Sequence, residues 1–491
     1  MPESDYNASE SSRRKRERSP VRKTAKVLEW IGGALLCLLI TATPWLFGTT
    51  EDWSIRVMNF GSYATGAIML ITAILNRIAG ATIETSGRER LLKYLFFSLN
   101  IAVLVFCAIA LWNARATFSI DTRSFNYHPS YNRSLPTTYD ADATRAQLLQ
   151  FLAFFVMFWS MRYWILLGDR RPASSEESGL LRNKRFQAIA WIFALNGFAI
   201  GIQGILQRLS RSSKLLWFRD SWWGDPLACF GPFSYRGNAA EYLNLLWPIA
   251  LGLWWIMTRE RRRRMGSSRM ITDGPELLLI PATVVMIAAC IISLSRGGAV
   301  IAAATLLVLA ALFLFQRTLQ LRARIGAGVF VAVVLVTVWF LGWEALTKRF
   351  ESDGMTNLSG RQEIYNNAKL ISRDFPKFGS GPGSFSAVYH LYRQAPDEWW
   401  QAFLHDDWLE TKVTFGAVGL GLVIAHLLLL PLWIPLPGRS PVFYGFHACA
   451  ILGLAAALMH AKFDFPFQTY SIAFTFVAVA AMLTSISPAR R

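Results

Sequence analysis

The sequence predicts an all-α integral membrane protein that crosses the bilayer about twelve times. Hydrophobic residues make up 53% of the chain, whereas charged residues make up only 17%. The apolar residues are gathered into blocks of about 20 residues, the length that a helix needs to cross about 30 Å of hydrocarbon. Most blocks lack a polar face at helical period, so a very hydrophobic soluble core is disfavoured.

The apolar blocks define the domain organisation. Residues 1–26 are polar and basic, and we expect a disordered cytoplasmic tail there. No small-residue cleavage site follows the first block, so that block is interpreted as a retained span. A second short tail occupies residues 487–491. The predicted spans are 27–47, 56–77, 93–112, 146–167, 187–206, 239–257, 276–294, 297–316, 325–343, 412–431, 442–460 and 468–486.

The positions of Lys and Arg predict the orientation. With the N-terminus in the cytoplasm, alternation of the spans places five connections on the cytoplasmic side. The first four of these connections are rich in arginine, which agrees with the positive-inside rule. These inner loops are 78–92, 168–186, 258–275, 317–324 and 432–441. The net charge of +18 is therefore concentrated at span ends. This pattern favours contact with anionic lipid head groups over binding of nucleic acid.

Three longer loops face outward, at 113–145, 207–238 and 344–411. The third is the largest, and its residues Ile364, Ala368 and Ile371 form one helical stripe. A GSGPG run at 379–383 predicts a sharp turn, and 398–413 predicts a helix that leads into the tenth span. We therefore expect a small helical cap at 344–411, between spans 1–9 (27–343) and spans 10–12 (412–486).

The segment FGPFSYRGNAAEYLNLLWP, at 230–248, carries ionisable groups to the outer edge of the sixth span. Arg236 stands just before the helix, Asn238 follows it, and Glu241 lies about one turn inside. An ionisable group within a span costs about 2.5–3.5 kcal/mol, so it normally faces a partner or a polar cavity. Two interpretations stay open: interfacial snorkelling with a local Arg236–Glu241 pair, or a cationic binding group at a helix N-terminus.

The short segment SLSRGG connects the seventh and eighth spans at the outer face. It holds Arg296 close to the membrane surface, beside Gly297 and Gly298. The two glycines would let backbone N–H groups approach a ligand closely. A plain turn between two helices is the alternative, and a second outward arginine makes the binding interpretation stronger.

The cap loop contains the best candidate for a general base. His405 is followed directly by two acids, and a nearby carboxylate can orient an imidazole and raise its basicity. The alternative is a solvated polar helix end. The other chemistry-bearing residues of this loop are Arg361, Asp374, Tyr389, Asp406, Asp407 and Glu410.

The turn HAKFDFPFQ, before the last span, places His460 and Asp464 at the same outer face, where a capped interhelical turn is the alternative. Arginines, one candidate base and no HExxH, CxxC or DxD motif suit a diphosphate leaving group neutralised by guanidinium groups. We therefore expect no metal and no cofactor. The five cysteines have no paired spacing and indicate neither a disulfide framework nor a zinc site.

These motifs, in their order and sidedness, resemble the O-antigen ligase and polymerase (Wzy-like) family. The matching elements are YRGNAAEYL, SLSRGG, the run GRQEIY…DFPKFGSGPGSF…HDDWLETKVTFGAVGLG and HAKFDFPFQ, within about residues 190–480. The resemblance implies a bacterial inner-membrane enzyme with the fold of the C-superfamily membrane glycosyltransferases. Its partners would be a polyprenyl-diphosphate-linked glycan donor, a lipid or glycan acceptor and inner-membrane lipids.

The resemblance also implies roles for individual residues. Arg236 and Arg296, with Arg361, would hold the donor diphosphate, and His405 would deprotonate the acceptor hydroxyl. Family members often have Asn directly after this histidine, where this chain has Asp406, so the catalytic partner of His405 stays open. Asp407 and Glu410 are the further candidates.

The supporting residues would be Asn238, Glu241, Gly297, Gly298, Tyr389, His460 and Asp464. A glycan ligase is the leading function. A repeat-unit polymerase and a protein O-oligosaccharyltransferase are alternatives with the same donor. A transporter of a lipid-linked solute is less favoured, because transporters place charges near the bilayer midplane, and here they gather at one face.

Overall fold

A computed structural model describes residues 20–81, 83, 86–168, 183–265, 274–314, 328–329, 332, 336, 356–394, 400, 402–433 and 441–486. Within these residues the chain is mostly helical, which agrees with the predicted class. Strands form two short antiparallel hairpins in the part described. They pair β1 (Ala116–Ser119) with β2 (Ser124–Tyr127), and β3 (Lys214–Leu215) with β4 (Arg219–Asp220).

Every predicted span except 325–343 coincides with a helix, and 325–343 lies outside the described residues apart from isolated positions. The helices are α2 (Pro20–Trp45), α3 (Asp52–Ile78), α4 (Gly87–Trp112), α5 (Ala141–Leu167), α7 (Lys184–Leu209), α8 (Arg236–Met265), α9 (Leu279–Ile292), α10 (Arg296–Leu314), α12 (Thr356–Asp374), α13 (Phe385–Tyr389), α14 (Asp407–Leu429), α15 (Pro441–His460) and α16 (Tyr470–Thr484). Short 3₁₀ turns precede α3 (Phe47–Thr49) and α9 (Pro275–Leu278) and follow α14 (Leu430–Trp433).

The described helices have the character of membrane spans. Eight of those in the described part are long and apolar enough to cross a bilayer, and the apolar helices Gly445–His460 and Tyr470–Thr484 are shorter. Large apolar side chains on the outer helices, such as Leu38, Phe60 and Leu307, are exposed. Such a surface is unfavourable in water and is expected where lipid covers it. The chain is therefore a multi-pass membrane protein, while the count of twelve spans stays a prediction.

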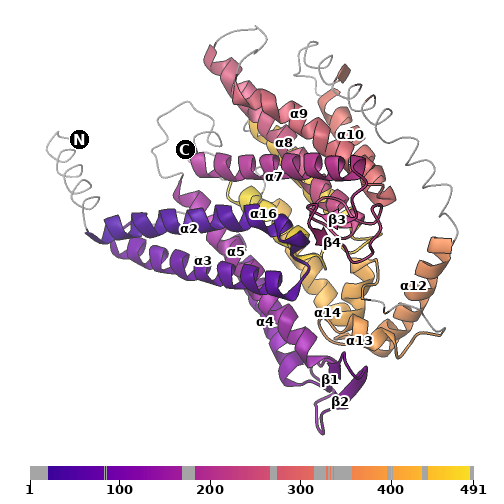
Figure 1. The fold of residues 1–491 in the computed structure, drawn as a ribbon. Helices are drawn as coiled ribbons and strands as arrows, with labels where there is room; N and C mark the ends of the chain where they lie inside the picture. The colour runs from indigo at the N-terminus through magenta and orange to yellow at the C-terminus, as the bar shows by residue number, and fades with distance from the viewer. Residues whose placement is uncertain are drawn as a thin grey trace.

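Helix α16 lies near the centre of the molecule, and α8 lies above it in the view of Figure 1, beside α9 and α10. Helix α8 packs against α7, α9, α10, α15 and α16, so most of its residues between 237 and 256 are buried. Its largest buried side chains include Tyr242 and Trp247. Because protein surrounds α8, its polar side chains are shielded from lipid and can face one another or a cavity.

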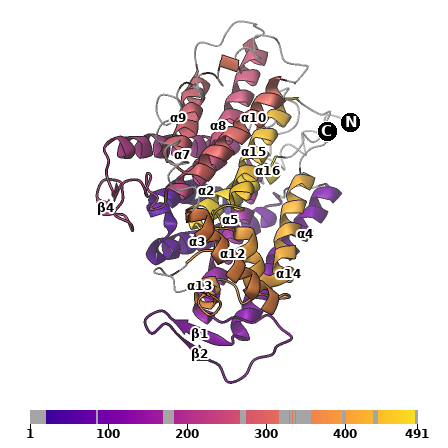
Figure 2. The same cartoon turned by 90° about the vertical axis from the view of Figure 1, so that its right-hand side faces the viewer.

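The cap forms a separate small core. Ile364, Ala368 and Ile371 are all buried, which confirms the predicted stripe of α12, and they pack with Phe385 and Val388 of α13. Figure 2 shows α12 and α13 at the lower end of the helices, with the β1–β2 hairpin below them. The predicted sharp turn is also present, since Gly379, Gly381 and Gly383 all have positive φ.

This turn is joined to an interruption in α14. At Gly416 (φ 65°, ψ −165°) the helix opens, and the freed backbone donors are used by the cap. Ala417 N donates to Pro376 O at 2.9 Å, and Val418 N donates to Lys377 O at 3.1 Å. A Cβ at Gly416 would lie 2.3 Å from Lys377 O, so only glycine fits at this position.

Two element boundaries differ from the predictions. Helix α2 begins at Pro20, so residues 20–26 are helical and do not belong to a disordered tail. Long basic side chains let a helix extend past the hydrocarbon, because they carry their charges into water. The helix predicted over 398–413 begins only at Asp407, because His405 has φ +57° and Asp406 acts as the N-cap.

Candidate functional site

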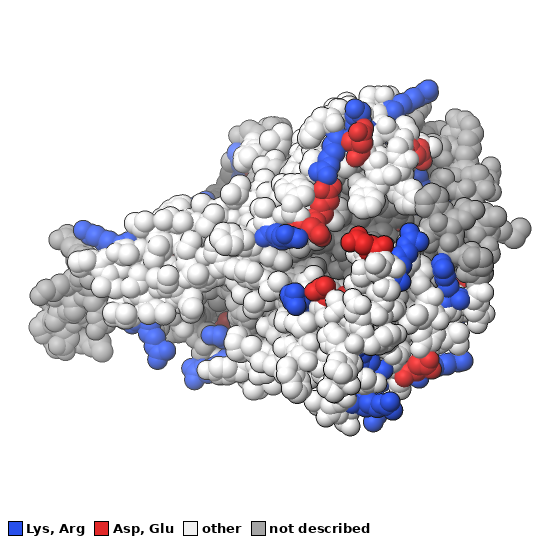
Figure 3. Space-filling model, turned by 60° about the horizontal axis from the view of Figure 1, so that its bottom comes forward, with Lys and Arg blue, Asp and Glu red and all other residues white. Residues whose placement is uncertain are grey.

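Turns that are far apart in the sequence meet at the end of the molecule that carries the cap. Tyr235 precedes α8, Gly297 lies in the first turn of α10, His405 precedes α14, and Asp464 lies between α15 and α16. Figure 3 views this end and shows acidic and basic side chains around a hollow. The structure thus brings together the four motifs that the sequence singled out.

The centre of the site is a histidine–aspartate pair. His405 Nδ1 lies 2.8 Å from Asp464 Oδ1, and the Tyr235 hydroxyl donates to Asp464 Oδ2 at 2.8 Å. Both carboxylate oxygens are therefore occupied, which fixes the orientation of Asp464. The ring of Phe465 lies edge-on to His405, with 4.8 Å between their centroids.

The tautomer of His405 follows from these contacts. Arg361 Nη2 also lies 3.4 Å from His405 Nδ1, but a guanidinium only donates, and so does an Nδ1 that is bonded to a carboxylate. The 2.8 Å contact to Asp464 is the hydrogen bond, and the arginine contact is a close approach without one. Within the described part of the chain, Nε2 of the ring has no hydrogen bond, so it carries the lone pair of a base.

The backbone around His405 is held in a strained conformation. Its φ of +57° is costly for a residue with a side chain. The Tyr365 hydroxyl donates to His405 O at 3.0 Å, and Asp406 caps α14 by accepting from Leu409 N at 3.0 Å. Arg361 Nη1 donates to Phe463 O at 2.8 Å, which ties the cap to the turn that carries Asp464.

The electrostatics of the pair favour an ionised aspartate. Burial alone would raise the pKa of Asp464, but the hydrogen bond and charge of His405 and the charge of Arg361 outweigh it, and the pKa is lowered. Burial raises the pKa of Tyr235 well above its ordinary value, and the nearby Asp464 charge adds to this effect. Tyr235 therefore stays protonated and donates to an ionised Asp464.

The two acids that follow Asp406 do not contact the His405 ring. Asp407 Oδ2 accepts from Phe467 N at 2.8 Å, and Glu410 Oε2 accepts from Leu404 N at 2.9 Å. These hydrogen bonds hold the backbone of the turn before α16 and of the segment before His405. Both side chains also line a cavity of about 260 Å³ whose other walls are mostly apolar side chains of α4, α5, α14 and α16. The carboxylate that orients His405 is Asp464, from another turn.

Asp406, which stands where family members often have Asn, has a structural role. Its side chain caps α14 and accepts from Lys462 Nζ at 2.5 Å. The charge of Lys462 offsets the extra anion, so Asp406 does not present an unpaired negative charge to the site.

Glu241 of α8 and His460 at the end of α15 form a second pair of ionisable groups, apart from the His405–Asp464 pair. Glu241 is 0% exposed, and its Oε1 lies 3.8 Å from His460 Nε2. Among the described residues, neither side chain has a hydrogen-bond partner. A Cβ on Gly297 would lie 2.9 Å from His460 Nε2, so the glycine is required for α10 to pack here. In the described part of the chain Glu241 lies against His460, so the structure does not show the Arg236–Glu241 pair expected as one interpretation.

The arginines predicted to bind an anion lie beside this centre. Arg236 is partly buried, and its Nη1 donates to Leu227 O at 2.6 Å. Arg296 is partly buried at the start of α10, where Ser295 caps the helix by accepting from Gly298 N at 3.1 Å. No hydrogen bond or ion pair of the Arg296 side chain is found in the described portion.

Three supporting candidates have packing roles. Asn238 is buried in the first turn of α8 and its backbone N donates to Tyr235 O at 3.1 Å. A Cβ on Gly298 would lie 2.4 Å from Ala240 Cβ, so this glycine permits close contact of α10 with α8. Tyr389 is buried in the cap core.

Sequence reasoning missed Tyr235 and Arg208. Tyr235 stands beside Arg236 in a motif that the sequence singled out, and this neighbourhood was the signal available in the sequence. Arg208 donates to Pro226 O at 2.6 Å and to Ser293 O at 3.0 Å, so it links the loop before α8 to the turn before α10. In the sequence it stands just beyond the predicted span 187–206, in an outer loop, and no motif marked it.

The fold and the site define a multi-pass membrane protein with a histidine–aspartate pair and arginines gathered at one face. Residues 281–424 match the family model described as O-antigen ligase, which confirms the resemblance to that family for this segment. The matched segment contains Arg296, Arg361 and His405, whereas Arg236 and Asp464 lie outside it. A comparison with curated proteins found no match to the chain. The family assignment supports an enzyme of the glycan ligase or polymerase type, with lipid-linked glycans as substrates in general.

Proposed function

We propose that this protein is a glycan ligase of the bacterial inner membrane. It transfers a polysaccharide from an undecaprenyl-diphosphate carrier to an acceptor hydroxyl on the periplasmic face, with both termini in the cytoplasm. The observation that carries this proposal is the 2.8 Å contact between His405 Nδ1 and Asp464 Oδ1, beside Arg361, in a chain whose segment 281–424 matches the O-antigen ligase family.

The chemistry requires a base, because a sugar hydroxyl is a poor nucleophile near neutral pH. With Nδ1–H held by Asp464, Nε2 of His405 accepts the proton of the acceptor hydroxyl. The acceptor oxygen forms a bond to the anomeric carbon, and the bond from that carbon to the diphosphate oxygen breaks, with its electron pair leaving on the diphosphate. A positioned base of this kind contributes a factor of roughly 10² to 10⁴.

The leaving diphosphate must be neutralised. Arg236 and Arg296 are the residues assigned to it, and Arg361 lies on the side of the base. Guanidinium groups suit this task because their planar donors match two phosphate oxygens at once. No step of this mechanism is assigned to a metal ion.

Other functions with the same donor differ only in the acceptor. A repeat-unit polymerase and a protein O-oligosaccharyltransferase would use the same base and the same arginines. The family description as O-antigen ligase favours the ligase. A transporter of a lipid-linked solute is disfavoured because the ionisable groups of the site gather at one end of the helices, not midway along them.

The test replaces His405 in cells that lack the wild-type gene. His405→Ala should abolish transfer while the purified protein still binds the lipid-diphosphate donor, and His405→Gln should be almost as inactive because it cannot accept a proton. His128→Ala, in the exposed β1–β2 hairpin, is the matched control and should stay active. Carrier-linked long chains that persist would indicate a ligase, and single repeat units on the acceptor would indicate a polymerase. Loss of donor binding in His405→Ala, with activity in His405→Gln, would refute the role of a base.

A further inference from the structure

A large hollow lies between the start of α3 and the loop that carries β3 and β4. Its volume is about 960 Å³. One wall is formed by residues 50–53 and Arg56, the other by residues 219–222 with Leu215, and Ser234 completes it. None of the sequence motifs with assigned chemistry includes the two walls.

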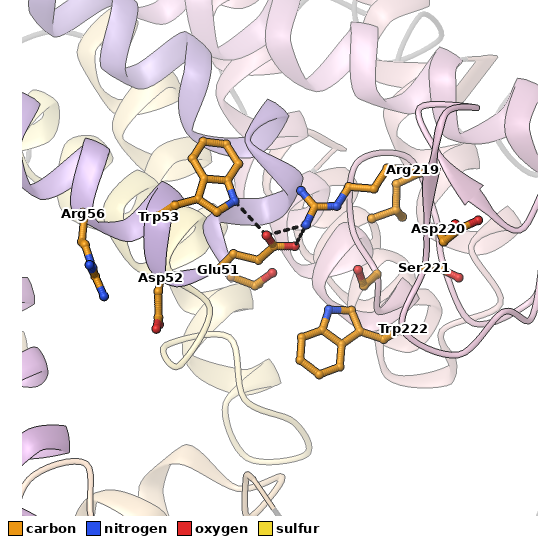
Figure 4. A pocket seen from close by; sticks show the side chains of 11 residues that line it. Glu51, Asp52, Trp53, Arg56, Arg219, Asp220, Ser221 and Trp222 are labelled. Carbon is orange, nitrogen blue, oxygen red and sulfur yellow. Dashed lines mark hydrogen bonds and ion pairs between the residues drawn. The ribbon is translucent and has the colours of Figure 1, made fainter. Parts of the chain in front are cut away.

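The centre of the hollow is a preorganised ion pair. Arg219 Nη2 lies 2.5 Å from Glu51 Oε1, and Trp53 Nε1 donates to Glu51 Oε2 at 2.8 Å. The guanidinium of Arg219 also lies over the ring of Phe47, at 4.3 Å from its centroid. In the view of Figure 4, Trp53 and Trp222 lie on either side of this pair. The polar groups are thus fixed in position before any ligand arrives.

Strained backbone flanks both walls. Phe47 and Thr49, next to one wall, have φ of 55° and 53°, and Leu216 and Trp217, next to the other, have φ of 50° and 65°. Residues with side chains adopt these angles at a cost, and such strain gathers where the surrounding structure requires a particular shape. The shape of the hollow is therefore imposed by the fold.

The lining suits a saccharide. A sugar ring is apolar on its faces and carries hydroxyl groups at its rim, so it packs on an indole face and hydrogen-bonds to charged groups at the edge. Trp222 is 77% exposed and Trp53 is also exposed. Glu51, Asp52 and Arg219 supply the acceptors and donors. A lipid tail would require an almost wholly apolar lining, whereas charged side chains stand among the apolar ones in this hollow.

The hollow is connected through the chain to the His405–Asp464 pair. Ser234 lines it, and the next residue, Tyr235, donates to Asp464. The loop that forms one wall also leads directly to Arg236, the candidate diphosphate ligand. We propose that this hollow is a saccharide-binding subsite that holds a segment of the donor glycan while its first sugar reacts. This inference rests on the proposed function and extends it.

The experiment measures affinity without measuring transfer. Full-length protein in nanodiscs is equilibrated with fluorescently end-labelled polysaccharide, released by mild acid from the carrier-linked pool of the producing cells. A second arm uses the lipid-free saccharide of the acceptor from the same cells. Loss of a hydrogen bond to a charged group weakens binding by about tenfold or more, so Glu51→Gln should show at least this loss. Trp222→Ala should show a similar loss, and Trp222→Phe should stay close to wild type.

Two control variants isolate the hollow. Trp112→Ala removes an equally exposed tryptophan at the end of α4, 79% exposed, and should leave affinity unchanged. His405→Ala should also bind normally, because the subsite does not use the base. If the affinity changes as expected in the variants but the wild-type protein transfers no glycan in cells, the subsite stands and the proposed function is refuted. If transfer occurs in cells but the substitutions at Glu51 and Trp222 leave the affinity unchanged, the proposed function stands and the subsite is refuted.

Three results would overturn the subsite. They are no binding of the donor polysaccharide by the wild type, an effect confined to the acceptor saccharide, and quenching of Trp222 fluorescence by brominated lipids. The last result, measured as the difference between wild type and Trp222→Phe, would place this tryptophan in the membrane interface, where tryptophan is common.

Discussion

Asp464→Asn tests the site with the smallest change that the geometry allows. The aspartate accepts two hydrogen bonds at 2.8 Å, one from His405 Nδ1–H and one from the Tyr235 hydroxyl. An asparagine of the same size has one acceptor oxygen and one NH₂ group. If its oxygen faces His405, the Tyr235 hydroxyl meets a donor. If its NH₂ group faces His405, the imidazole must move its proton to Nε2 and can no longer act as a base.

The expected loss follows from these two orientations. Losing one charge-assisted hydrogen bond costs about 1.5–3 kcal/mol, or roughly 10- to 150-fold in rate if the bond strengthens as His405 takes up the proton. Conversion to the wrong tautomer costs more, and in a comparable histidine–aspartate arrangement it lowers the turnover by about 10⁴-fold. We therefore expect a loss in kcat of at least about 10-fold, with little change in donor affinity.

The assay is single-turnover transfer of glycan from purified lipid-linked donor to acceptor in nanodiscs, with donor binding measured separately. The matched control is Asp374→Asn in the cap. Asp374 Oδ2 accepts from the Tyr392 hydroxyl at 2.6 Å, so this change makes the same replacement in an aspartate–tyrosine pair that has no histidine. An Asp464→Asn enzyme that keeps a rate close to that of the wild type would show that Asp464 does not orient the base.

The remaining predictions concern acid stability, the diphosphate site and topology. The pKa of Asp464 is lowered from 3.8 in the folded protein, so its contribution to stability is present above that value and is lost as the pH falls through the folded pKa. The thermal unfolding temperature of Asp464→Asn should therefore fall less on acidification than that of the wild type. Arg236→Ala and Arg296→Ala should each weaken donor binding by about 10- to 100-fold, lysine should restore only part of it, and a chelator should leave the wild-type rate unchanged. Inhibition by a chelator that magnesium reverses would contradict the arginine mechanism. A cysteine at Lys369, exposed on the cap, should react with an impermeant reagent in intact cells, and one at Ser86 should not; the opposite pattern would invert the predicted topology.

The helices were predictable because hydropathy is a local property. Each apolar block forms a helix where the structure describes it, and even the buried stripe of the cap, at Ile364, Ala368 and Ile371, could be read from its spacing. Helix starts were less predictable. The pattern of residues 398–406 favours a helix locally, but the left-handed backbone of His405 prevents a helix from passing through it. Nothing in the sequence signals its φ of +57°.

The partner of His405 could not be predicted from the sequence. Asp406, Asp407 and Glu410 are close along the chain, and proximity suggested them. The hydrogen bond is made by Asp464, 59 positions away, because the turn after α15 packs against the end of the cap. The burial of Ser384 shows the same limit: this residue directly follows the GSGPG run, where a polar side chain is expected to be exposed, yet it is fully buried in the cap. Both outcomes depend on tertiary packing, which local patterns do not encode.

The interruption of α14 at Gly416 has a consequence for engineering the protein. The cap supplies carbonyl oxygens to the open turn of this helix, and the segment after Gly379 receives two carbonyls of the helix in return, through Ser380 N to Val413 O and Gly381 N to Thr414 O. Cutting out the cap would leave unpaired backbone groups at a membrane-spanning helix, each costing several kcal/mol in hydrocarbon. The specificity of one relative cannot be transplanted to another by exchanging the loop alone. A functional chimera has to carry the cap and the outer half of α14 together, as a single exchangeable unit.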